Sequence, residues 1–279
     1  MKTNKKDFFA NYGLELVDSD HIMAPWGEVV PMPLTKGSKT LCFGWSTLAG
    51  TGEWTGIFNG EEIVVRGTCV CDCDHCYAKR GKYTCPDVIN GNIWRTIAAR
   101  NYSDWLEKAI TAQIQWGDSR KPYDLIRVHV AGDFFSEEYI QMWHRIASTC
   151  TETRFWSYTK NPVAETAYDD LANFNIVRSI VPNFGVNYGD AAYVVAMYEA
   201  LVSAGVEVYI CRCAMDEPDV KEGKKTVVDN HQHCKGCKGC SVNKYVLFLQ
   251  HGVAGYNKHK DPMYPVLCAL IENQPSMLI

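Results

Sequence analysis

The stretch Cys69-Val70-Cys71-Asp72-Cys73-Asp74-His75-Cys76 places four cysteines within eight residues. Three of them, Cys69, Cys73 and Cys76, have the spacing CxxxCxxC. Three thiolates on one short loop can hold three irons of a four-iron, four-sulfur (4Fe-4S) cluster and leave the fourth iron open to a small molecule. An open iron suits the reductive cleavage of a bound cofactor. The loop therefore predicts an iron–sulfur centre around which the rest of the chain is arranged.

Two other interpretations of this cysteine loop remain open. With Cys71 included, the four thiolates can form a closed tetrahedral zinc site. The cysteines can also form disulfides. Cys71 is additional to the CxxxCxxC pattern, so it either exchanges roles with Cys69 or points away from the metal. No export signal follows the charged N-terminus, so the 13 cysteines of the chain favour reduced thiols and metal over disulfides.

The overall composition is that of a globular protein. The 279 residues are 47% hydrophobic and 22% charged, which predicts one main domain with appendages. The net charge of −4 gives no basic surface of the kind that non-specific nucleic-acid binding needs. No stretch approaches the roughly 20 apolar residues that span a bilayer. We therefore expect a cytoplasmic protein without a membrane partner.

Strand-like and helix-like segments alternate along the chain. Ile63-Val64-Val65-Arg66-Gly67 is a β-branched run that leads into the cysteine loop. Residues 88–116 predict a helix broken near Asn101-Tyr102, with Ser103 as the N-cap of its second part. Ser136 predicts the N-cap of another helix, and a third extends from Asp190 to Gly205. Further strands are expected at residues 125–130, 154–158, 176–181 and 206–210.

This alternation, with a repeat of roughly 25 to 30 residues, argues for βαβ units and a parallel sheet. The fold class is therefore α/β, and a partial (β/α)6-type barrel fits the pattern. We expect an irregular N-terminal segment over residues 1–60 that packs on the core, the barrel over 61–210, and a C-terminal cysteine-rich region over 211–279.

The C-terminal region carries a second candidate metal site. Cys211-Arg212-Cys213 is followed by the triplet Cys234, Cys237 and Cys240, which has the spacing CxxCxxC. One cysteine of the first pair and the triplet supply four ligands, enough for a closed site with a structural or electron-relay role. Zinc and a second 4Fe-4S cluster both satisfy this spacing.

Three motifs carry a family resemblance. They are the CxxxCxxC loop with its continuation Cys76-Tyr77-Ala78, the segment from Arg127 to Ser136 that reads RVHVAGDFFS, and Tyr158-Thr159-Lys160-Asn161. Together they resemble the radical S-adenosylmethionine (radical SAM) superfamily and, more narrowly, the phage-associated "gene product 88" type of protein. The resemblance covers roughly residues 39 to 252.

The resemblance implies an enzyme, an oxidoreductase or transferase, that cleaves S-adenosylmethionine reductively and abstracts a hydrogen from a substrate. The substrate class it implies is a nucleotide, a nucleic acid or a peptide. An electron donor such as flavodoxin or ferredoxin would be the protein partner. It also implies Cys213 rather than Cys211 as a ligand, and favours iron–sulfur over zinc at the second site. The alternative is a zinc-stabilised nucleic-acid- or protein-binding module without catalysis.

The same resemblance assigns the residues that contact the cofactor. Ala131-Gly132-Asp133 stands where the superfamily has a Gly-Gly-Glu type motif that contacts the methionyl amino group, with Ala and Asp as departures from that pattern. Glycine lets the backbone approach a ligand closely. The cofactor-binding residues expected on this basis are His75, Tyr77, Ala131, Gly132, Asp133, Tyr158, Lys160 and Ser179.

Overall fold

The structure is a computed structural model. It describes residues 4–36, 42–70, 76–79, 81–117, 123–178, 191–206, 208–210 and 246–247. The chain divides into two compact units, Met1–Ile176 and Val177–Ile279. The expected division into 1–60, 61–210 and 211–279 stays a prediction, because most of the last part lies outside the described residues.

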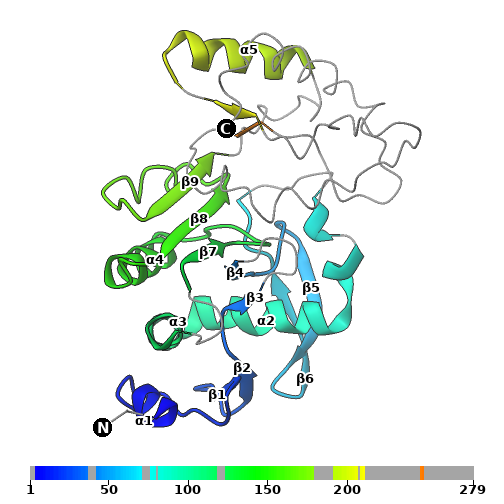
Figure 1. The fold of residues 1–279 in the computed structure, drawn as a ribbon. Coiled ribbons are helices and arrows are strands. Elements are labelled where there is room, and N and C mark those ends of the chain that lie inside the picture. The colour runs from blue at the N-terminus through cyan, green and yellow to red at the C-terminus, as the bar shows by residue number, and fades with distance from the viewer. Residues whose placement is uncertain are drawn as a thin grey trace, which may run out of the picture. The chain divides into compact units, whose positions relative to one another are not determined.

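A five-stranded sheet with the order β3-β4-β7-β8-β9 organises the first unit (Figure 1). Strands β4, β7 and β8 are parallel, with Phe43 opposite Ile126 and Ile126 opposite Phe155. Strand β3 is antiparallel to β4 at one edge. The strands are β3 (Thr35–Lys36), β4 (Phe43–Gly44), β7 (Leu125–Val128), β8 (Arg154–Thr159) and β9 (Phe174–Arg178).

Two antiparallel hairpins lie outside this sheet. One joins β1 (His21–Met23) to β2 (Val29–Pro31), and the other joins β5 (Glu53–Phe58) to β6 (Glu61–Arg66). The second hairpin turns at Asn59 and Gly60, which have positive φ angles of 52° and 77°. Two consecutive positive φ angles are what a two-residue hairpin turn matching the strand twist requires.

The strand before the cysteine loop therefore differs from its expected place. The sequence pattern assigns Ile63–Gly67 to the parallel sheet, but β6 pairs with β5 in the hairpin. The parallel strand that precedes β7 is β4 instead. A β-branched run specifies an extended backbone and not its partner, so the prediction of a strand is confirmed and its placement in the parallel sheet is wrong. The expected burial of this strand is also wrong, because Val65 is the one buried residue of β6.

Four α-helices accompany the described part of the first unit: α1 (Lys5–Ala10), α2 (Pro86–Asn101), α3 (Ser103–Trp116) and α4 (Glu137–Thr149). Helix α2 begins with a proline at its first turn, where the missing N–H costs nothing. Helix α3 ends at Gly117, which has a φ of 71°. Its N-cap is Tyr102, so the expected cap at Ser103 is wrong. Two short 3-10 helices, η1 (Tyr77–Lys79) and η2 (Gly81–Thr84), follow the cysteine loop.

Helix α4 packs its apolar face against the sheet. Its N-cap is Ser136, as expected, and the Ser136 side chain accepts a hydrogen bond from the backbone N–H of Tyr139. Trp143 and Ile146 are fully buried in one core cluster with Ile126, Val128 and Phe155 of β7 and β8. Burying an aliphatic or aromatic side chain contributes about 1.5–3 kcal/mol, so this cluster is the main stabilising contact of the sheet.

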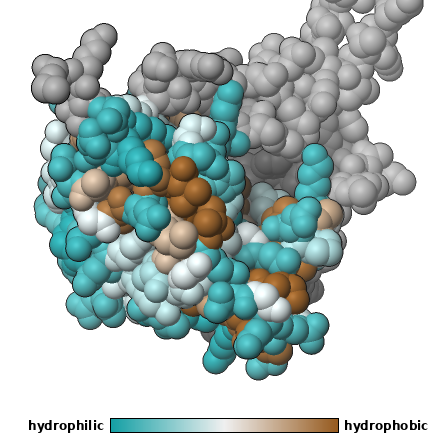
Figure 2. Space-filling model, turned by 90° about the horizontal axis from the view of Figure 1, so that it is seen from below, coloured by the Kyte–Doolittle hydropathy of each residue, from teal (hydrophilic) through white to brown (hydrophobic). Residues whose placement is uncertain are grey.

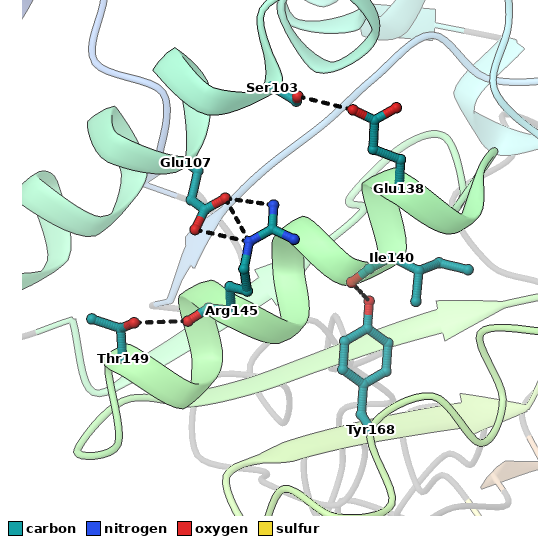
Figure 3. A network of polar contacts seen from close by, with 7 residues as sticks. All are labelled: Ser103, Glu107, Glu138, Ile140, Arg145, Thr149 and Tyr168. Carbon is teal, nitrogen blue, oxygen red and sulfur yellow. Dashed lines mark hydrogen bonds and ion pairs between the residues drawn. The ribbon is translucent and has the colours of Figure 1, made fainter.

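Helices α3 and α4 are also joined at their surface (Figure 3). The Arg145 guanidinium contacts both carboxylate oxygens of Glu107, with the shortest distance 2.7 Å. Nearby, the Tyr168 hydroxyl donates to the backbone carbonyl of Ile140 at 3.0 Å. These contacts align α4 with α3 on one side and with the segment after β8 on the other.

The described part of the second unit is small. It contains α5 (Ala191–Ser203) and the parallel pair β10 (Tyr209–Ile210) and β11 (Val246–Leu247). Gly205, with a φ of 74°, follows α5 as the sequence predicts. The described residues are thus mixed α/β with small sheets, and no closed barrel is found among them. A partial (β/α)6-type barrel stays a prediction.

On the face shown in Figure 2, hydrophobic side chains gather in patches that hydrophilic side chains surround. The described residues form no helix whose length and apolar character would let it cross a membrane. Large apolar side chains that the described residues expose are Val17, Val29, Ile57, Val64, Val70 and Val163.

Candidate metal centre

The segment from Gly67 to Cys69 is held by backbone hydrogen bonds. The N–H groups of Gly67, Thr68 and Cys69 donate to carbonyl groups of the segment from Leu48 to Gly52, at 2.8, 2.9 and 3.1 Å. A Cβ on Gly67 would lie 2.2 Å from the Gly50 carbonyl oxygen, so only glycine fits there. The first cysteine of the loop is therefore placed by an ordered backbone.

The described cysteines of the loop lie against one small apolar cluster. Cys69 and Cys76 both pack against a cluster of three buried alanines, Ala49, Ala78 and Ala131. The backbone N–H of Gly50 donates to the Cys69 sulfur at 3.1 Å. Such hydrogen bonds stabilise a thiolate and tune the reduction potential of a bound cluster. Neither cysteine forms a disulfide.

Ala131 brings the end of β7 to the cysteine loop, and Gly132 makes this approach possible. Gly132 has a φ of 86°, and a Cβ there would lie 1.9 Å from the Thr47 hydroxyl and 2.6 Å from the Thr68 hydroxyl. The two hydroxyls are 2.9 Å apart, and the Thr68 hydroxyl also donates to the Leu48 carbonyl. The turn after β7 therefore fits against the residue that precedes Cys69.

Asp133 joins the ends of β7 and β8. Its carboxylate accepts hydrogen bonds from the Thr159 hydroxyl at 2.6 Å and from the backbone N–H groups of Lys160 and Phe134 at 2.9 and 2.8 Å. Its own N–H donates to the Thr68 hydroxyl at 3.1 Å. Burial raises the pKa of Asp133, and the hydrogen bonds to its carboxylate oppose that rise. The carboxylate thus positions two strand ends, while its expected contact with a cofactor stays a prediction.

His129 lies beneath this turn, in the core. Its φ of 61° lies outside the extended range, so the regular alternation of side chains along β7 ends at Val128. The ring nitrogens lie 3.0 Å from the Tyr139 hydroxyl and 3.4 Å from the Ser157 hydroxyl. Burial and the charge of Arg127 lower the pKa of His129 to about 3, so the ring is neutral. Because Tyr139 is on α4, His129 belongs to the helix-facing layer.

Tyr158 and Lys160 are the other described residues expected near the cofactor. The backbone of Lys160 reaches Asp133, as given above. The Tyr158 ring instead lies 5.5 Å from the guanidinium carbon of Arg127, and its edge meets Trp156. Thr159 and Tyr158 are consecutive in β8, so their side chains point to opposite faces of the sheet. Tyr77 is placed only by its backbone, in η1.

Several expected ligands lie outside the described residues. They are Cys73, His75, Ser179, Cys213, Cys234, Cys237 and Cys240. Among the residues that the structure does describe, no group of three or more His, Cys, Asp or Glu side chains could hold a metal. The two cysteine sites therefore stay predictions.

Thr47 and Thr68 were not predicted from the sequence as part of the site, and Thr159 was named only within the motif Tyr158-Thr159-Lys160-Asn161. All three are buried and lie at the junction of the cysteine loop with the strand ends. Thr68 and Thr159 adjoin Cys69 and Lys160, which were singled out, so their positions offered a signal. Thr47 follows a strand of two residues, and nothing in its local sequence marks it.

A family model described as Gene product 88 matches residues 36–261, which is most of the chain. The chain is 40% identical over 68 residues to the Gene 88 protein of Mycobacterium phage D29, covering 24% of this chain and 28% of that protein. It is 42% identical over 43 residues to the Gene 88 protein of Mycobacterium phage L5, covering 15% and 18%. These matches span less than a third of either relative. No solved structure matches the chain.

These findings correct the expected superfamily. The family that matches is Gene product 88, and no radical SAM family matches, so the assignment to the radical SAM superfamily is wrong. The CxxxCxxC spacing is short and specifies a ligand arrangement, not ancestry. The function therefore has to be inferred from the chemistry of the residues in this chain.

Proposed function

The chain belongs to the Gene product 88 family, and from that premise we propose that it is a redox enzyme with an open-site 4Fe-4S cluster at Cys69, Cys73 and Cys76. One observation carries the proposal. Cys69 and Cys76 pack against one cluster of buried alanines, which includes Ala131 of the turn after β7. The carboxyl end of a parallel strand such as β7 is where α/β proteins carry their chemistry.

The described residues fit such a cluster in two respects. The Gly50 N–H points at the Cys69 sulfur, which favours the thiolate form that binds iron. The surrounding alanines form an apolar wall that limits access of water to one side of the site. Both features also suit zinc, so the identity of the metal has to be measured.

S-adenosylmethionine is the first cofactor to test. Cys69, Cys73 and Cys76 would hold the 4Fe-4S cluster, which would supply the electron for reductive cleavage of this cofactor. The residues around the cysteines would position the cofactor. The Ala131-Gly132 turn brings its backbone close to the cysteines, and the Thr68 hydroxyl holds that turn by accepting a hydrogen bond from the Asp133 N–H. A reduced flavodoxin or ferredoxin is the class of electron donor that such an enzyme needs.

A second metal at Cys213, Cys234, Cys237 and Cys240 completes the proposal. Four cysteine ligands close a site, so its role is structural or electron transfer and not cofactor binding. We propose a 4Fe-4S cluster there, and zinc is the other candidate.

The test is anaerobic purification followed by counting iron, sulfide and zinc per chain. Cys69→Ala and Cys76→Ala should each lose about four irons, whereas the control Cys85→Ala, an exposed free cysteine outside the loop, should keep them. Release of 5′-deoxyadenosine from S-adenosylmethionine under a strong reductant, abolished in the two loop variants, would then support the cofactor.

Two outcomes would overturn the proposal or part of it. Zinc at both sites without iron would favour a zinc-stabilised nucleic-acid- or protein-binding module. Iron at the loop without cleavage of S-adenosylmethionine would leave a redox protein with another cofactor.

A further inference from the structure

Two arginines lie beside the segment that enters the cysteine loop. Arg66 is the last residue of β6, and its Nε donates to the carbonyl oxygen of Thr51 at 3.0 Å. Arg100 is in the last turn of α2, and its Nη2 donates to the carbonyl oxygen of Gly67 at 3.1 Å. Both guanidinium groups are thus fixed to backbone close to Cys69 by one hydrogen bond each, which leaves most of their N–H donors for a ligand.

The Arg100 guanidinium also lies over an aromatic ring of the candidate site. Its central carbon is 5.3 Å from the ring centroid of Phe135, two residues after Asp133. A guanidinium held over an aromatic face is favourable and has a restricted orientation. Arg100 therefore connects the end of α2, the entry to the cysteine loop and the segment after β7.

The two arginines are bound to backbone segments that contact each other, because the N–H of Gly67 donates to the carbonyl of Gly52, the residue after Thr51. Burial and the positive charge of Arg66 both lower the pKa of Arg100. Among the described residues, neither arginine forms an ion pair with a carboxylate, although Glu53 is the cross-strand neighbour of Arg66. By contrast, Arg145 on α4 forms an ion pair with Glu107, whose two carboxylate oxygens accept its hydrogen bonds. Arg66 and Arg100 therefore place two positive charges near the entry to the cysteine loop, and no carboxylate among the described residues forms an ion pair with either.

We propose that Arg66 and Arg100 bind the phosphate group of a small phosphomonoester substrate next to the metal centre. A carboxylate needs only one guanidinium for two parallel hydrogen bonds. A phosphate monoester carries about −1.5 to −2 charges at pH 7, which matches two arginines. The net charge of the chain is −4, so the positive charge of Arg66 and Arg100 is confined to this site. A nucleic acid, which is contacted along many phosphates, therefore does not fit as the ligand.

The role as a substrate site rests on the proposed function, but binding of phosphate can be measured without the cluster. The experiment is calorimetric titration of the purified protein with inorganic phosphate and with a nucleoside monophosphate, and with acetate as a carboxylate probe. We expect phosphate and the monophosphate to bind in preference to acetate. Arg66→Gln and Arg100→Gln should each weaken phosphate binding by roughly tenfold or more, since each removes charge-assisted hydrogen bonds.

Lys108→Gln is the matched control, because it removes one exposed positive charge elsewhere, on α3, and should bind phosphate as the wild type does. A second measurement needs no variant: phenylglyoxal labelling of the native protein, in which phosphate should protect Arg66 and Arg100. Cys69→Ala should lose iron and keep phosphate binding, which separates failure of this inference from failure of the proposed function.

Three outcomes would overturn the inference. The first is a wild type that does not bind phosphate. The second is phosphate binding that neither arginine variant weakens. The third is labelling of both arginines that phosphate does not slow.

Discussion

At the scale of single residues, Gly132 sits where no side chain fits. Its positive φ is unfavourable for other residues, and the hydroxyls of Thr47 and Thr68 occupy the space that a Cβ would take. The residue therefore controls how closely the turn after β7 approaches Thr68, and through it Cys69. The same contact accounts for the position of Asp133, whose N–H reaches Thr68 only from this turn.

Gly132→Ala should lower the free energy of unfolding by about 2 kcal/mol or more, combining the left-handed backbone with displacement of two buried hydroxyls. Chemical denaturation measures this loss. Gly117→Ala is the matched control: Gly117 has a φ of 71° with no atom near its Cβ position, so only the backbone cost of about 1 kcal/mol applies. Equal losses in the two variants would mean that the hydroxyls move aside freely.

His129 is a second residue whose environment has a measurable consequence. Its pKa is lowered to about 3 from an ordinary value of 6.5, so the unfolded chain binds one more proton between these pH values. The free energy of unfolding should therefore fall as the pH falls from 6.5, by about 1.4 kcal/mol per pH unit from this residue. His129→Asn should remove that part of the slope, because asparagine tolerates a positive φ and does not titrate.

The measurement is the free energy of unfolding between pH 7 and pH 5, above the range where most carboxylates titrate. His144→Asn on α4 controls for the loss of an imidazole. A slope that persists unchanged in His129→Asn would show that this histidine is not held neutral by its surroundings.

At the scale of elements, α4 is the helix that the local sequence specifies best. It combines the Ser136 cap, two acidic residues in its first turn and an apolar face, and all three signals agree. Helix α3 starts differently: its first residue is Ser103, whose hydroxyl lies 3.4 Å from Glu138 and makes no cap. Ser136 and Ser103 both stand near the start of a helix, but only the Ser136 side chain caps its helix.

Ser136→Ala should destabilise the protein by about 1 kcal/mol, the usual cost of losing an N-cap side chain. Ser103→Ala should cost only a few tenths of a kcal/mol, because an exposed hydrogen bond at this distance contributes little. Thermal or denaturant unfolding of the pair measures the difference. Equal losses would contradict the assignment of Tyr102 as the N-cap of α3.

At the scale of the whole molecule, the two groups of cysteines are far apart in the chain, and we propose that they differ in coordination. The proposal gives the loop at Cys69–Cys76 an open site and the set from Cys213 to Cys240 a closed one. Two independent metals are expected.

Replacing Cys234 and Cys237 by alanine should therefore remove the second metal and keep the iron bound at the loop. Metal analysis together with the absorption spectrum of each variant measures this. Loss of all metal from either set of variants would instead indicate one site that both groups of cysteines share.

Local sequence by itself determined the extended run before the cysteine loop and the cap of α4. Each of these depends on residues within a few positions of one another. The Asn59-Gly60 pair was also a local signal, for the hairpin of β5 and β6, and it outweighs the β-branched run that pointed to a parallel sheet. Spacing alone did not determine the family, because few residues are needed to bind a cluster.

Only the tertiary structure decided which segments meet. It placed β4 beside β7, brought Thr47 and Thr68 against Gly132, and turned His129 into the core beside Tyr139. These contacts join residues ten or more positions apart, and their geometry depends on sheet register and on backbone angles that periodicity does not encode. The position of Arg66 next to Arg100 has the same origin, since a hairpin and a helix end must pack together to bring the two charges into proximity.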